Sequence, residues 1–144
     1  MVRRTVCVLC VTIMLASAAL TGCGSLGPAY EHPAAVAVEE LLRLRADDVR
    51  DAGAYEPYFL DPAVADALVE PSANATGTPR VPDWERPYVS EETSATADVV
   101  VVWKPSDDFP DWPDVNIFVM SLVEDRWVVS DAEEATQAPP PLGE

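Results

Sequence analysis

The sequence has few of the side chains that most often carry catalysis or bind transition metals. Its three cysteines lie at positions 7, 10 and 23, and its single histidine is His32. From residue 24 onward there is no thiol, which excludes disulfides and thiolate chemistry in that part of the chain. Zinc, which favours cysteine and histidine ligands, would find one imidazole and no thiolate there. We therefore expect no metal site and no cofactor.

Basic residues are scarce as well. Nine Lys and Arg stand against 25 Asp and Glu, which gives a formal net charge of −16 at pH 7. Such a charge repels phosphate-rich polymers and anionic lipid headgroups, so the composition disfavours nucleic-acid binding and electrostatic docking on lipids. The same charge keeps a domain soluble beside a negative surface, and it would also suit a basic partner.

Residues 1–22 have the three parts of a secretory signal. Arg3 and Arg4 give a basic start, and the chain from Val6 to Leu20 is an uncharged apolar run of about 15 residues that ends on small side chains. The run is short for a membrane-spanning helix, which needs about 20 apolar residues. Removal of this segment would leave seven basic and 25 acidic residues, a net charge of −18 with an acylated N-terminus.

The four residues Leu20-Thr21-Gly22-Cys23 resemble the lipobox of bacterial lipoprotein precursors. In that family the thiol of the last residue is alkylated with a diacylglyceryl group, and signal peptidase II cuts just before it. The resemblance implies a lipid on Cys23 that anchors the protein at the extracytoplasmic face of the cell membrane. The alternatives are an ordinary signal peptide that is cut elsewhere and an N-terminal anchor that is never cut.

The mature chain divides into three parts by composition. Residues 24–33 contain two glycines and two prolines without a period, which predicts a flexible tether over 23–33, lipidated residue included. Residues 34–131 have the patterns of one α+β domain. The proline-rich residues 132–144 predict a disordered tail.

Two helices are expected at the start of the domain. Between residues 34 and 50 the apolar side chains fall on one helical stripe, and Gly53 is a plausible stop. The members of this stripe are Val38, Leu41, Leu42, Ala46 and Val49. Asp61 followed by Pro62 is typical of a helix start, which predicts a shorter helix over residues 62–69. Residues 71–87 are rich in Pro, Ser, Thr and Gly and predict a loop.

The second half of the domain is expected to form strands. Three runs are rich in β-branched and aromatic residues, at 97–104, 115–123 and 126–131. The short turn Glu124-Asp125 makes the last two an antiparallel hairpin, and the segment around Tyr88 is a candidate edge strand. The central runs are apolar on both faces, unlike a sheet with one solvated face. The helices can cover one face, and the other needs more chain, a second copy of this protein, or a protein partner.

This order of elements is similar to the nuclear-transport-factor-like cone, an α+β fold in which helices lie on a curved antiparallel sheet. The similarity spans about residues 34–131 and includes the final hairpin with Arg126-Trp127-Val128-Val129. It implies a pocket beneath the helices, where catalytic members of the family place an Asp with a His or Tyr. Tyr55 and Tyr58 follow the first helix here, but residues 34–131 contain no histidine. A β-sandwich fragment and another two-layer α+β domain are the alternatives.

The stretch from Lys104 to Asp114 is the most distinctive part of the domain. Its four carboxylates within eight residues are a candidate calcium site, although three prolines restrict how the loop can wrap an ion. We favour an exposed loop. Phe109 and Trp112 in this loop, with Tyr55 and Tyr58, are the candidate partner or ligand surface, because aromatic residues are enriched at interfaces.

The leading functional hypothesis is a lipid-anchored, non-enzymatic binding or accessory module at the cell envelope. It rests on the lipobox, on the missing catalytic residues and on the sheet that is apolar on both faces. One alternative is a small pocket enzyme of the cone fold, an isomerase or dehydratase that uses Asp or Tyr side chains. The other alternative is a structural component of the envelope.

We predict that Cys23→Ser abolishes lipidation, because the thiolate is the nucleophile and a serine hydroxyl is far less reactive. Labelling cells with an alkyne fatty acid should give no signal for this variant, whose signal peptide should remain uncleaved at Gly22. Cys10→Ser is the matched control and should be labelled like the wild type. A normal level of label on the Cys23→Ser protein would contradict the lipoprotein assignment.

Overall fold

The computed structural model describes residues 27–69 and 81–144. The predicted signal peptide, the lipobox with Cys23 and most of the loop expected at 71–87 lie outside these residues. Within the described residues, no helix combines the length and the apolar character needed to cross a membrane. In chain order the elements are α1 (Pro28–Glu31), α2 (Pro33–Ala46), α3 (Ala52–Tyr55), the 3-10 helix η1 (Glu56–Tyr58), α4 (Ala63–Val69), β1 (Tyr88–Glu92), β2 (Thr96–Val102), β3 (Val115–Val123) and β4 (Arg126–Ala135).

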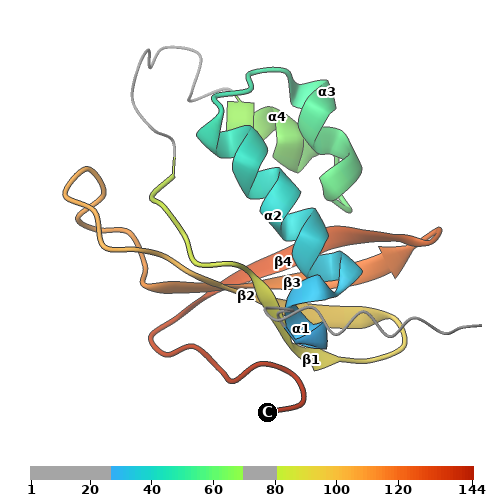
Figure 1. The fold of residues 1–144 in the computed structure, drawn as a ribbon. Coiled ribbons are helices and arrows are strands. Elements are labelled where there is room, and N and C mark those ends of the chain that lie inside the picture. The colour runs from blue at the N-terminus through green and yellow to red at the C-terminus, as the bar shows by residue number, and fades with distance from the viewer. Residues whose placement is uncertain (1–26, 70–80) are drawn as a thin grey trace, which may run out of the picture.

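The four strands form one antiparallel sheet in the order β1-β2-β3-β4. Each strand therefore lies beside its neighbour in the sequence, the arrangement that short connections favour. Figure 1 shows α2, α3 and α4 together on one side of the sheet, with α1 beside β1. The protein is thus a single small α+β domain with an antiparallel sheet, as the sequence predicted.

Proline determines where all of the described helices except α3 begin. Pro28, Pro33 and Pro57 occupy the first turn of α1, α2 and η1, and Pro62 directly precedes α4. The proline ring fixes φ near its helical value and removes an amide that would have no partner at that position. The chain consequently forms α1 and η1 in addition to the two helices that we expected at 34–50 and 62–69. A further short helix, α3, begins without a proline.

The end of α2 differs from the expectation. The helix ends at Ala46, and Asp48 has a φ of 58°, in the left-handed region that ends an α-helix. Gly53, expected to stop this helix, instead lies within α3. The side chain of Asp51 begins α3 by accepting a hydrogen bond from the Gly53 amide at 3.0 Å.

The strands agree closely with the patterns in the sequence. β3 has the predicted bounds, β1 is the edge strand around Tyr88, and the last two strands form the predicted hairpin. Its two turn residues, Glu124 and Asp125, have φ values of 49° and 61°, as a two-residue hairpin turn with matching twist requires. β4 is longer than predicted, because it stays paired with β3 as far as Ala135.

The main core lies between the helices and one face of the sheet. Val38, Leu41 and Leu42 of α2 are buried against the sheet, where Val99 and Val101 point toward them. Alternation along β2 places these two valines on one face, because successive side chains of a strand point to opposite sides. The helical stripe and the alternating strand thus meet as the sequence predicted.

The opposite face of the sheet is covered in part by the two ends of the domain. Ala29 and Tyr30 of α1 and Ala138 near the C-terminus pack with the strand residues Tyr88 and Val100. Residues 28–33, predicted to belong to a tether, are therefore part of the folded domain. The tail predicted to be disordered from residue 132 instead continues β4 as far as Ala135, and Ala138 packs against the sheet. The reason is the apolar second face of the sheet, which these segments shield from water.

The C-terminal segment is also held by hydrogen bonds. The hydroxyl of Tyr88 donates to the Pro139 carbonyl at 2.6 Å, and the Leu142 amide donates to the Val89 carbonyl at 2.8 Å. Figure 1 accordingly shows the C-terminus beside β1. Ile117 and Val119 on the same face of β3 are only half-buried, and a protein partner or a second copy at this face stays a prediction.

The environment of Tyr88 keeps its hydroxyl protonated. Burial raises the pKa of Tyr88 above its usual value, and the nearby Tyr30, Glu85 and Glu144 raise it further by charge repulsion. A raised pKa in the folded state stabilises the protein below the unfolded pKa, which is about 10. This contribution is lost as the pH rises above that value through the folded pKa, so the docked segment should loosen in alkaline solution.

We predict that Tyr88→Phe loosens the C-terminal segment, because it deletes the hydrogen bond to Pro139 and keeps the ring. Hydrogen exchange at the Leu142 amide should become faster in the variant at neutral pH. Tyr30→Phe is the control, since Tyr30 packs its ring against Tyr88 with centroids 5.3 Å apart. Exchange at Leu142 that is equally fast in both variants would show that the Tyr88 hydroxyl does not hold the segment.

A candidate pocket beneath helix α2

A pocket of about 470 Å³ lies between α2, the segment that contains η1 and α4, and the sheet. This volume is within the range of about 300–1,000 Å³ that is common for small-molecule sites. Apolar side chains from all three parts form most of its walls. They include Leu41, Leu42, Phe59, Val64, Trp103 and Phe118.

Local structure determines which side chains reach the pocket. Leu41 and Arg45 of α2 are four residues apart, which places both on one face of the helix. On the opposite wall, Phe118 of β3 is paired with Val99 and points to the helix side of the sheet. Phe59 forms a parallel bridge with Val129 at the outer edge of β4. The amide of Leu60 donates to the Val129 carbonyl at 2.9 Å and fixes this segment there.

Most polar groups of the lining already have partners within the protein. The indole Nε1 of Trp103 donates to Oδ1 of Asn116 at 2.8 Å, and Nδ2 of Asn116 donates to the Glu133 carbonyl at 3.2 Å. Ser130 Oγ donates to the Val119 carbonyl at 2.9 Å. Asp131 Oδ1 accepts from the Ala132 amide at 2.8 Å. These groups keep the strand end and the pocket wall in place.

Trp112 is the exception among the buried side chains. Its ring meets the rings of Trp103 and Phe109 edge to face, with centroids 5.4 Å apart in both pairs. Among the described residues, its Nε1 is the one buried side-chain nitrogen or oxygen without a hydrogen-bond partner. An unsatisfied buried donor costs about 1–3 kcal/mol. Other atoms of Trp112 line the pocket, whereas Nε1 itself has almost no exposed surface.

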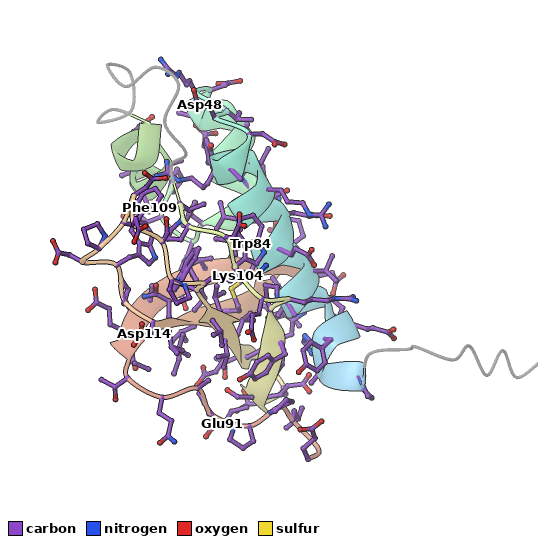
Figure 2. The ribbon with its side chains drawn as sticks, turned by 60° about the vertical axis from the view of Figure 1, so that its left-hand side comes forward. Asp48, Trp84, Glu91, Lys104, Phe109 and Asp114 are labelled. Atoms are coloured by element: carbon purple, nitrogen blue, oxygen red, sulfur yellow. The ribbon has the colours of Figure 1, made fainter. Side chains whose placement is uncertain are left out.

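The two aromatic rings of the 104–114 loop contact each other beside the pocket. Trp112 lines the pocket, and Phe109 beside it lines a neighbouring hollow of about 450 Å³. Figure 2 shows Phe109 at the end of the loop that is nearer to the helices, and Asp114 at the end that meets the sheet. Of the aromatic pair predicted from the sequence, Trp112 therefore lines the candidate pocket and Phe109 packs beside it, and a ligand or partner at this pair stays a prediction.

Tyr55 and Tyr58 do not join this pair. Tyr55 is fully buried, and its hydroxyl donates to the carbonyls of Leu44 at 3.1 Å and Val49 at 2.6 Å. Tyr58 donates to Glu40 Oε2 at 3.2 Å, outside the pocket. Burial raises the pKa of Tyr58, and the charge and the hydrogen bond of Glu40 raise it further. The prediction that Tyr55 contributes to a ligand surface is wrong, because the residue instead joins α3 to the end of α2.

His32 was expected to lie in the tether, but it begins α2. Its Nδ1 accepts a hydrogen bond from the Ala34 amide at 3.1 Å, and Nε2 lies 2.9 Å from Oε1 of Glu92. Since Nδ1 accepts, the network assigns the proton to Nε2, which donates to the carboxylate. The ring also meets Trp127 edge to face, with centroids 5.3 Å apart. His32 is thus part of the domain and joins α2 to the sheet, away from the pocket lining.

Sequence reasoning missed four polar residues of the lining, Arg45, Asn116, Ser130 and Asp131. Asn116 has a recognisable signal, because it is a lone amide inside the apolar run of β3, where a buried polar side chain needs a partner. Arg45 and Asp131 have no comparable signal. Charged side chains like these two are common on helices and strands, so nothing in the sequence marks them as pocket residues. Only the packing of α2 against β4 brings them to one pocket.

The carboxylates of the 104–114 loop do not form a metal site in the structure. Throughout residues 27–69 and 81–144, no group of three or more His, Cys, Asp or Glu side chains could hold a metal ion. The calcium alternative therefore gains no support.

In comparisons with known proteins, no family model, curated protein or solved structure matches the chain.

We predict that Tyr55→Phe lowers the free energy of unfolding by about 1–3 kcal/mol, because two carbonyls lose the hydroxyl that they share. Tyr58→Phe removes a more exposed hydroxyl and should change the free energy by about 0.5 kcal/mol or less. Urea denaturation of both variants measures the difference. Equal losses would show that the Tyr55 hydroxyl does not join α3 to α2.

Proposed function

We propose that the chain is a lipid-anchored, non-enzymatic binding module of the bacterial envelope that holds an apolar ligand in the pocket beneath α2. The observation that carries this proposal is the pocket itself, about 470 Å³ in volume and lined mainly by aliphatic and aromatic side chains. Removal of apolar ligand surface from water supplies the free energy of binding.

The anchor would place this pocket near the membrane. Cys23 precedes the first residue of α1 by five positions, and five extended residues span at most about 18 Å. The domain would therefore lie close to the lipid on Cys23, and two acyl chains hold a protein stably where a single chain is marginal. The net negative charge of the chain disfavours contact with anionic headgroups. A ligand that partitions into membranes would be concentrated beside such a module.

The proposal includes the similarity to the nuclear-transport-factor-like cone. Helices on one face of an antiparallel sheet, with a pocket between the two layers, are what that similarity implies. The four-stranded order and the final hairpin support it. As fold alone does not determine activity, the functional proposal rests on the pocket residues.

The pocket-enzyme alternative receives less support from the lining. It would use Asp or Tyr side chains as acid and base, but Tyr55 and Tyr58 do not line the pocket. Asp131 does line it, and one of its carboxylate oxygens accepts from the Ala132 amide. General acid–base catalysis needs a second group within hydrogen-bond reach of the same reacting atoms. We therefore propose binding without chemistry.

We predict that the full chain binds diphenylmethane, a probe without polar atoms, in this pocket. The indole N–H signals of Trp103 and Trp112 should shift on titration, whereas those of Trp84 and Trp127, which do not line the pocket, should not. Val64→Phe should weaken binding by about tenfold, because the added ring occupies the pocket. Val36→Phe is the matched control, since both valines are helical and 40% exposed but only Val64 lines the pocket.

Two outcomes would overturn the proposal. The first is the absence of any change in the signals of Trp103 and Trp112 when the probe is added up to its solubility limit. The second is an equal loss of affinity in Val64→Phe and Val36→Phe, which would place the probe elsewhere on the protein.

A further inference from the structure

The face of the sheet opposite to α2, here called the outer face, has a stripe of aliphatic side chains along β3 that stays partly exposed. Ile117, Val119 and Val123 alternate with the residues that point to the helices, and they belong to neither of the two hydrophobic cores. Ile117 and Val119 are half-buried, and Val123 is 36% exposed. The C-terminal segment packs farther along this face, near Val100 and Val115.

The stripe ends in a hollow of about 400 Å³ beside the turn between β3 and β4. Val123 and Val128 line the hollow from the strands, and Pro57 and Leu60 line it from the segment between α3 and α4. Leu60 is 54% exposed. Apolar pockets of this kind at protein interfaces receive a large side chain of the partner.

Carboxylates border the stripe on both sides. Asp98 of β2 is paired with Val119 of β3, which places it on the outer face. Glu133 of β4 is paired with Ile117 and lies on the same face. Paired residues have Cβ atoms about 5 Å apart, so both carboxylates are within reach of a molecule that covers the stripe. On β1, Glu91 is paired directly with Asp98.

This arrangement has an electrostatic cost. Like charges directly opposite each other destabilise a pair of strands, and Glu91 and Asp98 are such a pair. Among the described residues, neither of them nor Glu133 forms an ion pair. Arg126 is the only basic residue in the four strands, and it lies at the hollow, which Glu56 also lines. A positively charged partner would relieve the repulsion between the carboxylates.

The charges decide which occupant suits the outer face. A second copy of the chain would bring the same surface to the interface, because a two-fold contact uses one patch on both subunits. Its carboxylates would then meet carboxylates, which is unfavourable. Anionic lipid headgroups would be repelled for the same reason. A basic protein segment has the complementary charge.

The dimensions of the stripe suit a helix. From Ile117 to Val123 the stripe spans about 20 Å, at about 3.3 Å per residue. An α-helix of about 13 residues has this length. The side chains that border the apolar stripe of a helix lie on both of its sides, so Lys or Arg there would reach the carboxylates of β2 and β4 together. In a strand, the side chains that alternate with the apolar ones would point away from the sheet.

We propose that the outer face binds a basic amphipathic helix of a partner protein. The aliphatic side chains of the helix contact Ile117 and Val119, and its Lys or Arg side chains pair with Asp98 and Glu133. A large side chain near the end of the helix fills the hollow at Leu60. This site is separate from the pocket beneath α2 and goes beyond the function proposed for that pocket.

Two synthetic peptides test the proposal on the full chain. The basic peptide has two repeats of Leu-Lys-Lys-Leu-Leu-Lys-Leu, about 14 residues with one leucine stripe at helical spacing. The acidic peptide has glutamate at every lysine position and keeps the leucine stripe. At about 0.15 M salt, exposed charges more than about 8 Å apart are largely screened. The basic peptide should then bind about tenfold more tightly than the acidic peptide, because only its charges complement the outer face.

NMR and one pair of variants locate the bound peptide. The methyl signals of Ile117 and Val119 should shift with the basic peptide, whereas that of Val64, which lines the pocket beneath α2, should not. Glu133→Lys should weaken binding of the basic peptide by about two- to tenfold. Glu134→Lys is the matched control and should change the affinity less. It makes the same change of charge at the next residue of β4, which points to the other face of the sheet.

Three outcomes would overturn the proposal. The first is that neither peptide binds or that both bind equally well. The second is an equal loss of affinity in Glu133→Lys and Glu134→Lys. The third is a change in the methyl signals of Ile117 and Val119 when the protein alone is diluted, which would show a second copy at this face. Each outcome leaves the proposed function standing, because diphenylmethane binding tests the pocket beneath α2 separately.

Discussion

The structure depends on one constraint, a four-stranded sheet that is apolar on both faces and must be covered on both. On one face α2 supplies Val38, Leu41 and Leu42, which meet the inward side chains of β2. On the other face the two ends of the domain, α1 and the C-terminal segment, pack around Tyr88 and Val100. The termini of the domain are therefore structural parts, because without them the second face would be exposed to water.

The pocket arises where cover of the first face is incomplete. The segment with η1 and α4 is held to the outer edge of β4 through Phe59 and Leu60, so it borders the sheet without filling the space above it. Large aromatic rings, Trp103 and Phe118, form the floor and walls in place of a close-packed helix. The same packing that shields the sheet leaves an apolar hollow beneath the C-terminal half of α2, and this hollow is the basis of the proposed function.

Polar groups in this layer show how strictly an apolar interior must satisfy its donors. Tyr55 satisfies two carbonyls at the end of α2, and Trp103 is satisfied by Asn116. Among the described residues, the buried indole nitrogen of Trp112 is the exception, because it has no hydrogen-bond partner. The pocket combines mainly apolar walls with a few polar residues, which is the usual composition of a small-molecule site.

Local patterns in the sequence determined the strands, the two-residue turn of the last hairpin and the helices at α2 and α4, because alternation, helical periodicity and N-caps act between near neighbours. The sequence also singled out Phe109 and Trp112 as candidate surface residues of the 104–114 loop. Only the tertiary structure decided the roles of His32, whose partner Glu92 is 60 residues away, and of Tyr88, whose partner Pro139 is 51 residues away. The sequence showed that the second face of the sheet needed cover. That α1 and the C-terminal segment supply part of it depends on long-range packing, which no local pattern contains.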